Sequence, residues 1–68
     1  MSTNVIEFPG AALIGKIKTF GPSGPAYEIL APLRQLEDGD WIIKVRLVAT
    51  GEEAEYRYTH VLDDPKAA

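Results

Sequence analysis

The sequence predicts an all-β fold, a small curled antiparallel sheet of about four strands. Residues 40–48 alternate with period two, so that one side of an extended segment is fully apolar. That side consists of Trp41, Ile43, Val45 and Leu47. Turn pairs flank this stretch at Asp38-Gly39 and Thr50-Gly51, and a further strand candidate lies beyond each turn. A central strand with an antiparallel partner on each side follows from this pattern.

The chain before the first strand is expected to form a flexible tail, residues 1–10. Pro9-Gly10 at its end breaks any regular element that would continue. Three apolar residues of this segment, Val5, Ile6 and Phe8, leave docking on a neighbour or a short edge strand as alternatives.

The first strand is expected within residues 11–20. Gly15 indicates a bulge or a close crossing, and Lys16 and Lys18 mark the face in contact with water. The Gly-Pro-Ser-Gly-Pro run at residues 21–25 ends this strand, because its glycines and prolines favour neither helix nor ladder.

The second strand is expected within residues 26–36, where Pro32 lacks a ladder N–H and therefore requires an edge position or a β-bulge. A two-residue turn at Asp38-Gly39 would place Leu36 opposite Trp41. One extra residue at Pro32 then turns a well-buried set toward the apolar face. This set is Ala31, Ile29 and Tyr27.

The next hairpin is expected to turn at Thr50-Gly51, which pairs Val45 with Tyr56 and Ile43 with Tyr58. The same register pairs Leu47 with Ala54 and places Arg46 opposite Glu55. After Tyr58, Thr59 is expected to cap a single helical turn, and Pro65 discourages helix at Asp64.

Four strands, three tight connections and one terminal turn in about 50 residues describe a strongly bent sheet or a small SH3-like open barrel. The β domain is expected to span residues 11–64, with a C-terminal tail at 65–68. The alternative is a flat sheet that packs face to face in a homodimer. The most buried side chains are expected to be Trp41, Val45, Leu47 and Tyr56.

Composition limits the function classes. A chain of 68 residues makes one domain, and its 46% hydrophobic content is typical of folded proteins. The absence of cysteine removes disulfides and thiolate zinc sites and favours a reducing compartment. The net charge of −3 disfavours general nucleic-acid binding, because phosphate neutralisation needs a surplus of Lys and Arg.

No apolar run approaches the roughly 20 residues that a membrane span requires, and no signal-peptide pattern is visible. The longest uncharged run, residues 8–15, is interrupted by Pro9 and Gly10. We therefore expect a cytoplasmic protein without a membrane partner.

Residues 18–29, Lys-Thr-Phe-Gly-Pro-Ser-Gly-Pro-Ala-Tyr-Glu-Ile, resemble a segment of a family of small bacterial proteins of unknown function. The resemblance covers most of residues 13–66, including Thr50-Gly51-Glu52-Glu53, Tyr56 and Asp64-Pro65. It implies a bacterial origin and an independent small domain, and it transfers no catalytic residue.

The Gly-Pro loop is the first candidate for a binding site. Its two Gly-Pro pairs make a stiff segment that loses little entropy on binding a partner protein. The alternative is a wide connection that only turns a barrel corner. The predicted partner-binding residues are Phe20, Gly21, Pro22, Gly24, Pro25 and Tyr27.

A second candidate is a basic face with nearby aromatic rings, as in proteins that stack nucleic-acid bases. Its residues would be Lys16, Lys18, Lys44 and Arg46. The acidic net charge favours the other interpretation, in which the aromatic rings belong to the core and the basic side chains are solvated.

Chemical sites receive little support from the sequence. His60, Asp63 and Asp64 are better explained as the solvated end of a helix than as metal ligands, so neither a metal nor a cofactor is expected. Ser2 and Ser23 lie in a tail and a loop without a neighbouring base for a catalytic triad.

These observations predict a non-catalytic cytoplasmic protein-interaction module that regulates or inhibits a partner protein. An antitoxin-like or anti-defence role suits its size and mild acidity. The alternative function is an SH3-like nucleic-acid-binding protein that uses the Lys/Arg face.

Overall fold

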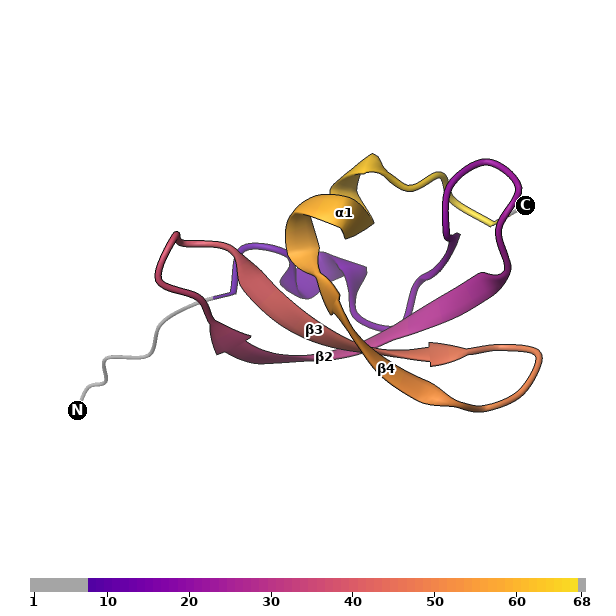
Figure 1. Ribbon diagram of the computed structural model, residues 1–68, viewed down its shortest axis with the longest axis horizontal. Helices are drawn as coiled ribbons and strands as arrows, with labels where there is room; N and C mark the ends of the chain where they lie inside the picture. Colours follow the sequence, from indigo (N-terminus) through magenta and orange to yellow (C-terminus); the bar gives the residue numbers. More distant parts are fainter. Residues whose placement is uncertain (1–7, 68) are drawn as a thin grey trace.

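The computed structural model describes residues 8–67, which form a four-stranded antiparallel sheet and one short helix (Figure 1). The strands follow one another in the sheet in the order β1-β2-β3-β4. Their bounds are β1 Ile17–Thr19, β2 Ala26–Gln35, β3 Trp41–Leu47 and β4 Glu53–Arg57. A 3-10 turn, η1 (Ala11–Leu13), precedes the sheet, and α1 (Tyr58–Asp63) follows it. The predicted fold class is therefore confirmed.

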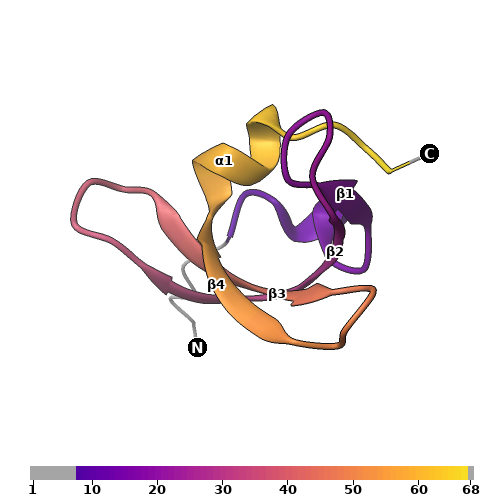
Figure 2. The same cartoon turned by 45° about the vertical axis from the view of Figure 1, so that its right-hand side comes forward.

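The sheet is strongly bent, and α1 lies over its concave side (Figures 1 and 2). Two register shifts in β2 account for the bend, one between Ile29 and Ala31 and one between Pro32 and Arg34. Each places an extra residue in the longest strand, and a bulged strand curves and twists more than a regular one. The bulge predicted at Pro32 is present, and a second one precedes it.

The registers of both hairpins differ from the predicted ones. Gln35, rather than Leu36, lies opposite Trp41, because residues 36–40 form a longer turn in which the Leu36 N–H donates to the Asp40 carbonyl (2.8 Å). The prediction of a two-residue turn at Asp38-Gly39 is therefore wrong.

In the hairpin of β3 and β4, Ile43 lies opposite Tyr56 and Val45 opposite Ala54, a shift of two residues from the predicted register. The Leu47 N–H donates to the Glu52 carbonyl and the Gly51 N–H donates to the Leu47 carbonyl, both at 2.8 Å, so residues 48–51 form a four-residue turn in place of the predicted two-residue turn. Because side chains alternate with period two, the shift leaves Tyr56 on the apolar face.

The first strand is shorter than predicted. Only Ile17–Thr19 pairs as a strand, because Gly15 adopts a φ of +88° and donates its N–H to the Ile29 carbonyl (2.7 Å), which turns the chain just before β1. The prediction that Lys16 and Lys18 both face water is correct for Lys16 and wrong for Lys18, whose side chain is buried.

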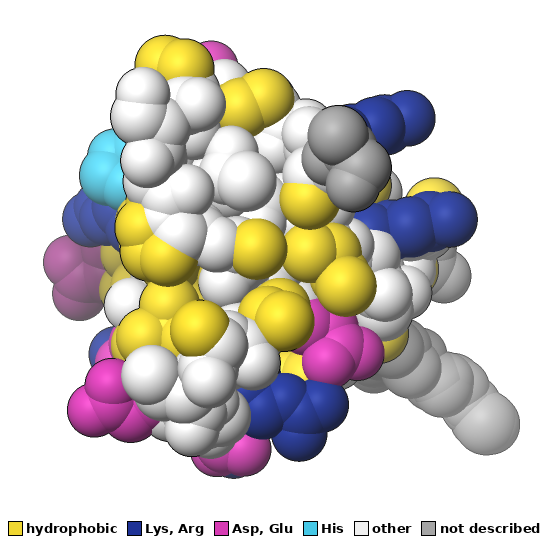
Figure 3. Space-filling model, turned by 90° about the vertical axis from the view of Figure 1, so that its right-hand side faces the viewer, with side chains coloured by type: hydrophobic (Ala, Val, Ile, Leu, Met, Phe, Trp, Pro, Cys, Tyr) yellow, Lys and Arg dark blue, Asp and Glu magenta, His cyan; other side chains and the backbone are white. Residues whose placement is uncertain are grey.

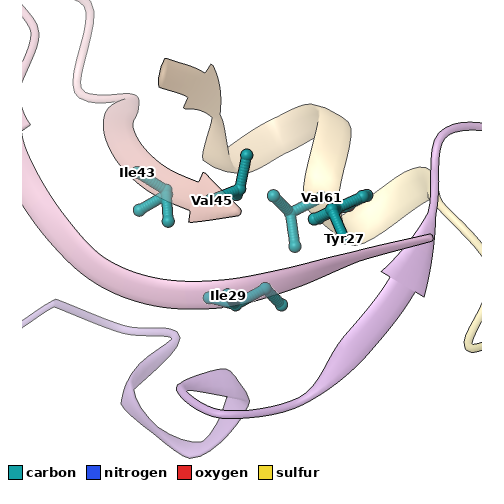
Figure 4. Packing of buried hydrophobic residues seen from close by; sticks show 5 residues of the cluster. All are labelled: Tyr27, Ile29, Ile43, Val45 and Val61. Atoms are coloured by element: carbon teal, nitrogen blue, oxygen red, sulfur yellow. The ribbon is translucent and has the colours of Figure 1, made fainter. Parts of the chain in front are cut away.

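The core lies between the concave side of the sheet and α1 (Figure 4). Its fully buried members are Tyr27, Ile29, Ile43, Val45 and Val61. Val61 comes from α1 and covers the centre, so residues nearer the sheet margin are only partly buried. Val45 was therefore predicted correctly as a most buried side chain, whereas the remaining three are half-buried: Trp41, Leu47 and Tyr56.

The described end of the predicted N-terminal tail packs on the sheet. The Phe8 ring meets the rings of Trp41 and Tyr58 edge to face, at centroid distances of 5.3 and 4.9 Å. Gly10 is buried beside the Phe8 and Tyr58 rings. Residues 1–7 of the predicted tail, with Val5 and Ile6, lie outside the described residues.

The predicted C-terminal tail also makes contacts as far as Ala67. The Thr19 N–H donates to the Pro65 carbonyl, and the Ala67 N–H donates to the Ile17 carbonyl, both at 3.1 Å. Lys66 thus forms an antiparallel bridge to Lys18 in β1. This segment satisfies backbone groups along the outer edge of β1.

The terminal helix is present, but Thr59 does not cap it. Arg57 occupies the N-cap position without a side-chain hydrogen bond. The Asp40 carboxylate accepts hydrogen bonds from the Thr59 N–H (3.2 Å) and hydroxyl (2.8 Å). A carboxylate from the turn between β2 and β3 therefore satisfies the first turn of the helix. Neither helical segment of residues 8–67 is long and apolar enough to cross a membrane.

Candidate functional site

Asp64, at the C-terminal end of α1, contacts three other parts of the molecule: the loop between β1 and β2, the strand β2 and the strand β4. Its Oδ2 accepts hydrogen bonds from the hydroxyls of Tyr27 (2.7 Å) and Tyr56 (2.9 Å). Its Oδ1 accepts one from the Gly21 N–H (3.0 Å). One carboxylate therefore holds the helix end against β2, β4 and the loop between β1 and β2.

The ionisation of this cluster follows from its burial and its hydrogen bonds. Burial alone would raise the pKa of Asp64. The hydrogen bonds that its carboxylate accepts, together with the nearby positive charge of Lys18, outweigh burial and hold this pKa below its usual value; the donors are Tyr27, Tyr56 and Gly21. Burial and the Asp64 carboxylate raise the pKa of Tyr56 to about 12 and raise that of Tyr27 further. The cluster is thus one carboxylate with two neutral phenols at neutral pH, which suits a structural anchor.

Lys18 places a positive charge near this cluster. Its side chain is only 7% exposed, and its Nζ donates a hydrogen bond to the Val61 carbonyl in α1. A cation near the C-terminal end of a helix interacts favourably with the carbonyl groups left without intrahelical partners. Lys18 therefore ties β1 to the helix and is not available to a ligand.

The Gly-Pro loop is held by one hydrogen bond between its two ends and by a second one at its start. The Phe20 N–H donates to the Pro25 carbonyl (3.1 Å), and the Thr19 hydroxyl donates to the Gly21 carbonyl (2.7 Å). A Cβ placed on Gly24 would lie 1.9 Å from the Phe20 carbonyl oxygen, so only glycine fits there. With the bond from Gly21 to Asp64, these contacts hold the loop in one shape.

The aromatic residues beside the loop face inward. Phe20 stacks on Tyr27 with a centroid distance of 4.2 Å and meets Tyr56 edge to face at 4.9 Å. Tyr27 is fully buried and Phe20 is half-buried. Of the six residues predicted to bind a partner, Tyr27 is therefore inaccessible and Phe20 is mainly a packing residue.

The exposed residues of the loop are Pro22, Ser23 and Pro25, and the two prolines are its apolar part. Gly21 and Gly24 are half-buried. Val48 is 54% exposed and lies beside this loop, because its N–H is bonded to the Ala26 carbonyl.

Figure 3 looks onto this end of the molecule, where apolar side chains run across the middle and charged side chains lie around the margin. Pro22, Pro25 and Val48 together are called the loop face below.

The four basic residues of the alternative site do not form a shared free surface. Lys44 pairs with Glu53 (3.4 Å), and Arg46 pairs with Glu28 (2.7 Å), both on the convex side of the sheet. Lys18 is buried and Lys16 is exposed.

No metal centre is found within residues 8–67, where no three His, Cys, Asp or Glu side chains are grouped to hold an ion. Asp64 binds the two tyrosine hydroxyls, and His60 lies beside the Tyr56 ring at a centroid distance of 5.5 Å. The sequence analysis missed the anchoring role of Asp64. The available signal was that buried tyrosine hydroxyls need hydrogen-bond partners.

The fold and these contacts define a small antiparallel β protein whose terminal helix is anchored to a Gly-Pro loop. Residues 4–68 match a family of unknown function, DUF5397, and the chain belongs to that family. An uncharacterized protein of Haemophilus influenzae (strain ATCC 51907 / DSM 11121 / KW20 / Rd) is 40% identical over 53 residues, which cover 78% of this chain and 84% of that protein. The predicted membership of a family without an assigned function is confirmed.

Proposed function

We propose that this protein is a non-catalytic cytoplasmic module that binds a partner protein and regulates or inhibits it. The observation that carries the proposal is the loop face, an exposed apolar surface on a loop held by the contacts of Asp64. Inhibition of a toxin or of a defence protein would be one form of such regulation.

Rigidity is what makes this surface suitable for binding. Hydrogen bonds at the base of the loop, the bond from Gly21 to Asp64 and the close approach at Gly24 fix it before any partner arrives. A surface that is already ordered loses little conformational entropy on association. Apolar atoms at the centre and charged groups at the margin are also the usual arrangement of a protein interface.

The connectivity supports a finer description as an SH3-like open barrel. β4 is followed by the short helix α1, and the chain then returns to bridge β1 at Lys66. Small barrels of this kind use their connecting loops for recognition.

Affinity capture from a bacterial lysate tests the function, with Val48→Glu as the informative variant and Leu33→Glu as the matched control. Both side chains are exposed, at 54% and 41%, so both variants should fold, and Leu33 lies away from the loop on β2. We expect the wild type and Leu33→Glu to retain the same partner and Val48→Glu to retain at least about tenfold less. Equal retention by all three, or no captured protein beside turnover of a small molecule, would contradict the proposal.

Nucleic-acid binding is the competing outcome, and its salt dependence identifies it. Retardation of short DNA or RNA that falls steeply between about 50 and 200 mM salt would replace the proposal. In that case Lys44→Ala should reduce the salt slope by about one unit and Val48→Glu should have little effect.

A further inference from the structure

A groove of about 480 Å³ lies between the segment that follows η1 and the C-terminal segment that bridges β1. Its lining residues are Leu13, Gly15, Lys16, Ile17, Lys66 and Ala67. The groove is open to solvent and mainly apolar, and Ile17, which lines it, is 42% exposed although it belongs to a paired strand. It is separate from the loop face.

The distribution of ion pairs sets this groove apart. The chain has seven Lys and Arg residues. Four of them pair with acidic side chains: Arg34, Lys44, Arg46 and Arg57. Lys18 is buried against the Val61 carbonyl. The remaining two, Lys16 and Lys66, make no ion pair within residues 8–67, and both line the groove.

The groove therefore combines an apolar lining with two ammonium groups that form no ion pair with the described residues. An apolar side chain would bury surface against Leu13 and Ile17, and carboxylates beside it would reach Lys16 and Lys66. In an extended peptide with alternating residues, the apolar side chains on one side can face the groove while the carboxylates on the other side lie at its mouth, where the exposed side chains of Lys16 and Lys66 can reach them.

We propose that this groove binds a short extended segment of the partner protein in which acidic and apolar residues alternate. This inference rests on the proposed function and names the chemistry of the partner. Two lysines on a chain of net charge −3 are too few for a phosphate polymer, whose binding depends on neutralising many charges. On the convex side the Lys and Arg side chains are already paired with acidic residues, so an acidic segment is favoured at this groove over that side.

Fluorescence anisotropy with a labelled peptide of about eight alternating Glu and Leu residues tests the inference. Two control peptides have the same length: one alternates Lys and Leu, and the other alternates Glu and Ser. We expect the Glu-Leu peptide to bind at least about tenfold more tightly than either, and to shift the backbone NMR signals of Lys16, Ile17 and Lys66. No binding, equal binding of all three peptides, or signal shifts elsewhere would overturn the inference.

Charge reversal on the protein gives a second test of the inference. Lys16→Glu with Lys66→Glu should weaken binding of the Glu-Leu peptide by at least about tenfold. Arg34→Glu with Lys44→Glu changes the net charge equally on the convex side of the sheet and should weaken it by no more than about twofold. Both pairs are surface changes, and circular dichroism checks that each variant is folded. Equal losses in the two variants would contradict the assignment to the groove.

The two proposals fail in different ways. If lysate capture retains a partner on the wild type and equally on the Lys16→Glu, Lys66→Glu variant, and the Glu-Leu peptide does not bind, only the groove inference fails. If the peptide binds in the groove and no protein is captured from the lysate, the regulatory function fails and the groove assignment stands.

Discussion

The concave and the convex side of the sheet both carry charged residues, but they hold them in different ways. On the concave side, Lys18 is buried and Asp64 is half-buried, and each contacts donors or acceptors fixed by other elements. The convex side carries ion pairs whose side chains remain 31% to 57% exposed. These pairs are Arg34 with Glu55, Lys44 with Glu53 and Arg46 with Glu28.

Burial distinguishes the charged groups that define the structure from those that do not. A buried donor that loses its acceptor costs about 1–3 kcal/mol, whereas an exposed ion pair contributes about 0–1 kcal/mol. Within residues 8–67, every buried side-chain nitrogen and oxygen has a hydrogen-bond partner. The part-buried contacts of Asp64 therefore fix how the loop, strands and helix meet, while the exposed convex pairs contribute little to stability.

A charge placed in the core without a partner should have the largest effect. Val45→Asp puts a carboxylate at a fully buried position, at a cost of several kcal/mol, which is comparable with the whole stability of a chain this small. We expect no cooperative thermal transition by circular dichroism. Val48→Asp makes the same change at a 54% exposed position and should melt close to the wild type. A cooperative transition in Val45→Asp would show that the sheet is not packed as described.

Removal of the anchoring carboxylate should come next. Asp64→Ala takes the acceptor from the two tyrosine hydroxyls and the Gly21 N–H, and we expect a loss of about 3 kcal/mol in the free energy of unfolding. Asp63→Ala, an exposed neighbour, should change it by less than about 0.5 kcal/mol. Denaturant titration measures both values, and similar losses would refute the distinction between half-buried and exposed acids.

High pH should weaken the same cluster from the tyrosine side. The pKa of Tyr56 in the folded protein is about 12, above its ordinary value of 10.0, so the folded state binds this proton more tightly than the unfolded chain. The stability that this contributes is complete below pH 10 and is lost as the pH rises through about 12. Ultraviolet absorbance of tyrosinate follows the titration. Ionisation of Tyr56 near its ordinary pKa in the folded protein would contradict the cluster.

Low pH should act through Asp64 in the opposite direction. Because the pKa of Asp64 is held below its ordinary value of 3.8, its contribution to stability is complete above that pH and is lost as the pH falls through the lower, folded-state value. Asp64→Ala should therefore show a shallower decrease in stability with acid than the wild type. Thermal melts between neutral and acidic pH measure the difference, and parallel curves would exclude a role for this carboxylate.

The smallest effect is expected on the convex side. Arg46→Ala removes the closest of the exposed ion pairs, with Glu28 at 2.7 Å, and should cost less than about 1 kcal/mol. The loss should shrink further in high salt, because exposed charges are screened. Denaturant titration at two salt concentrations checks this. A loss as large as that of Asp64→Ala would mean that the convex pairs also define the fold.

Local patterns in the chain are sufficient for the broad fold. The alternation along residues 41–47 specifies a strand with one apolar side, and the turn residues on either side specify antiparallel neighbours. Pro32 specifies a bulge, and Pro65 a limit to the terminal helix. These features depend on nearest neighbours in the chain, and the structure has all of them.

The hairpin register depends on turn length, and the site depends on contacts between distant residues. Two registers that differ by two residues bury the same side chains, so alternation cannot choose between them, and the four-residue turn closed between Leu47 and Glu52 sets the observed one. Lysine side chains usually face water. Lys18 is buried because its ammonium group donates a hydrogen bond to the carbonyl of Val61, which lies 43 residues away in the sequence. The Asp64 carboxylate likewise accepts hydrogen bonds from Tyr27 and Gly21 only because packing of the helix on the sheet brings these donors within reach.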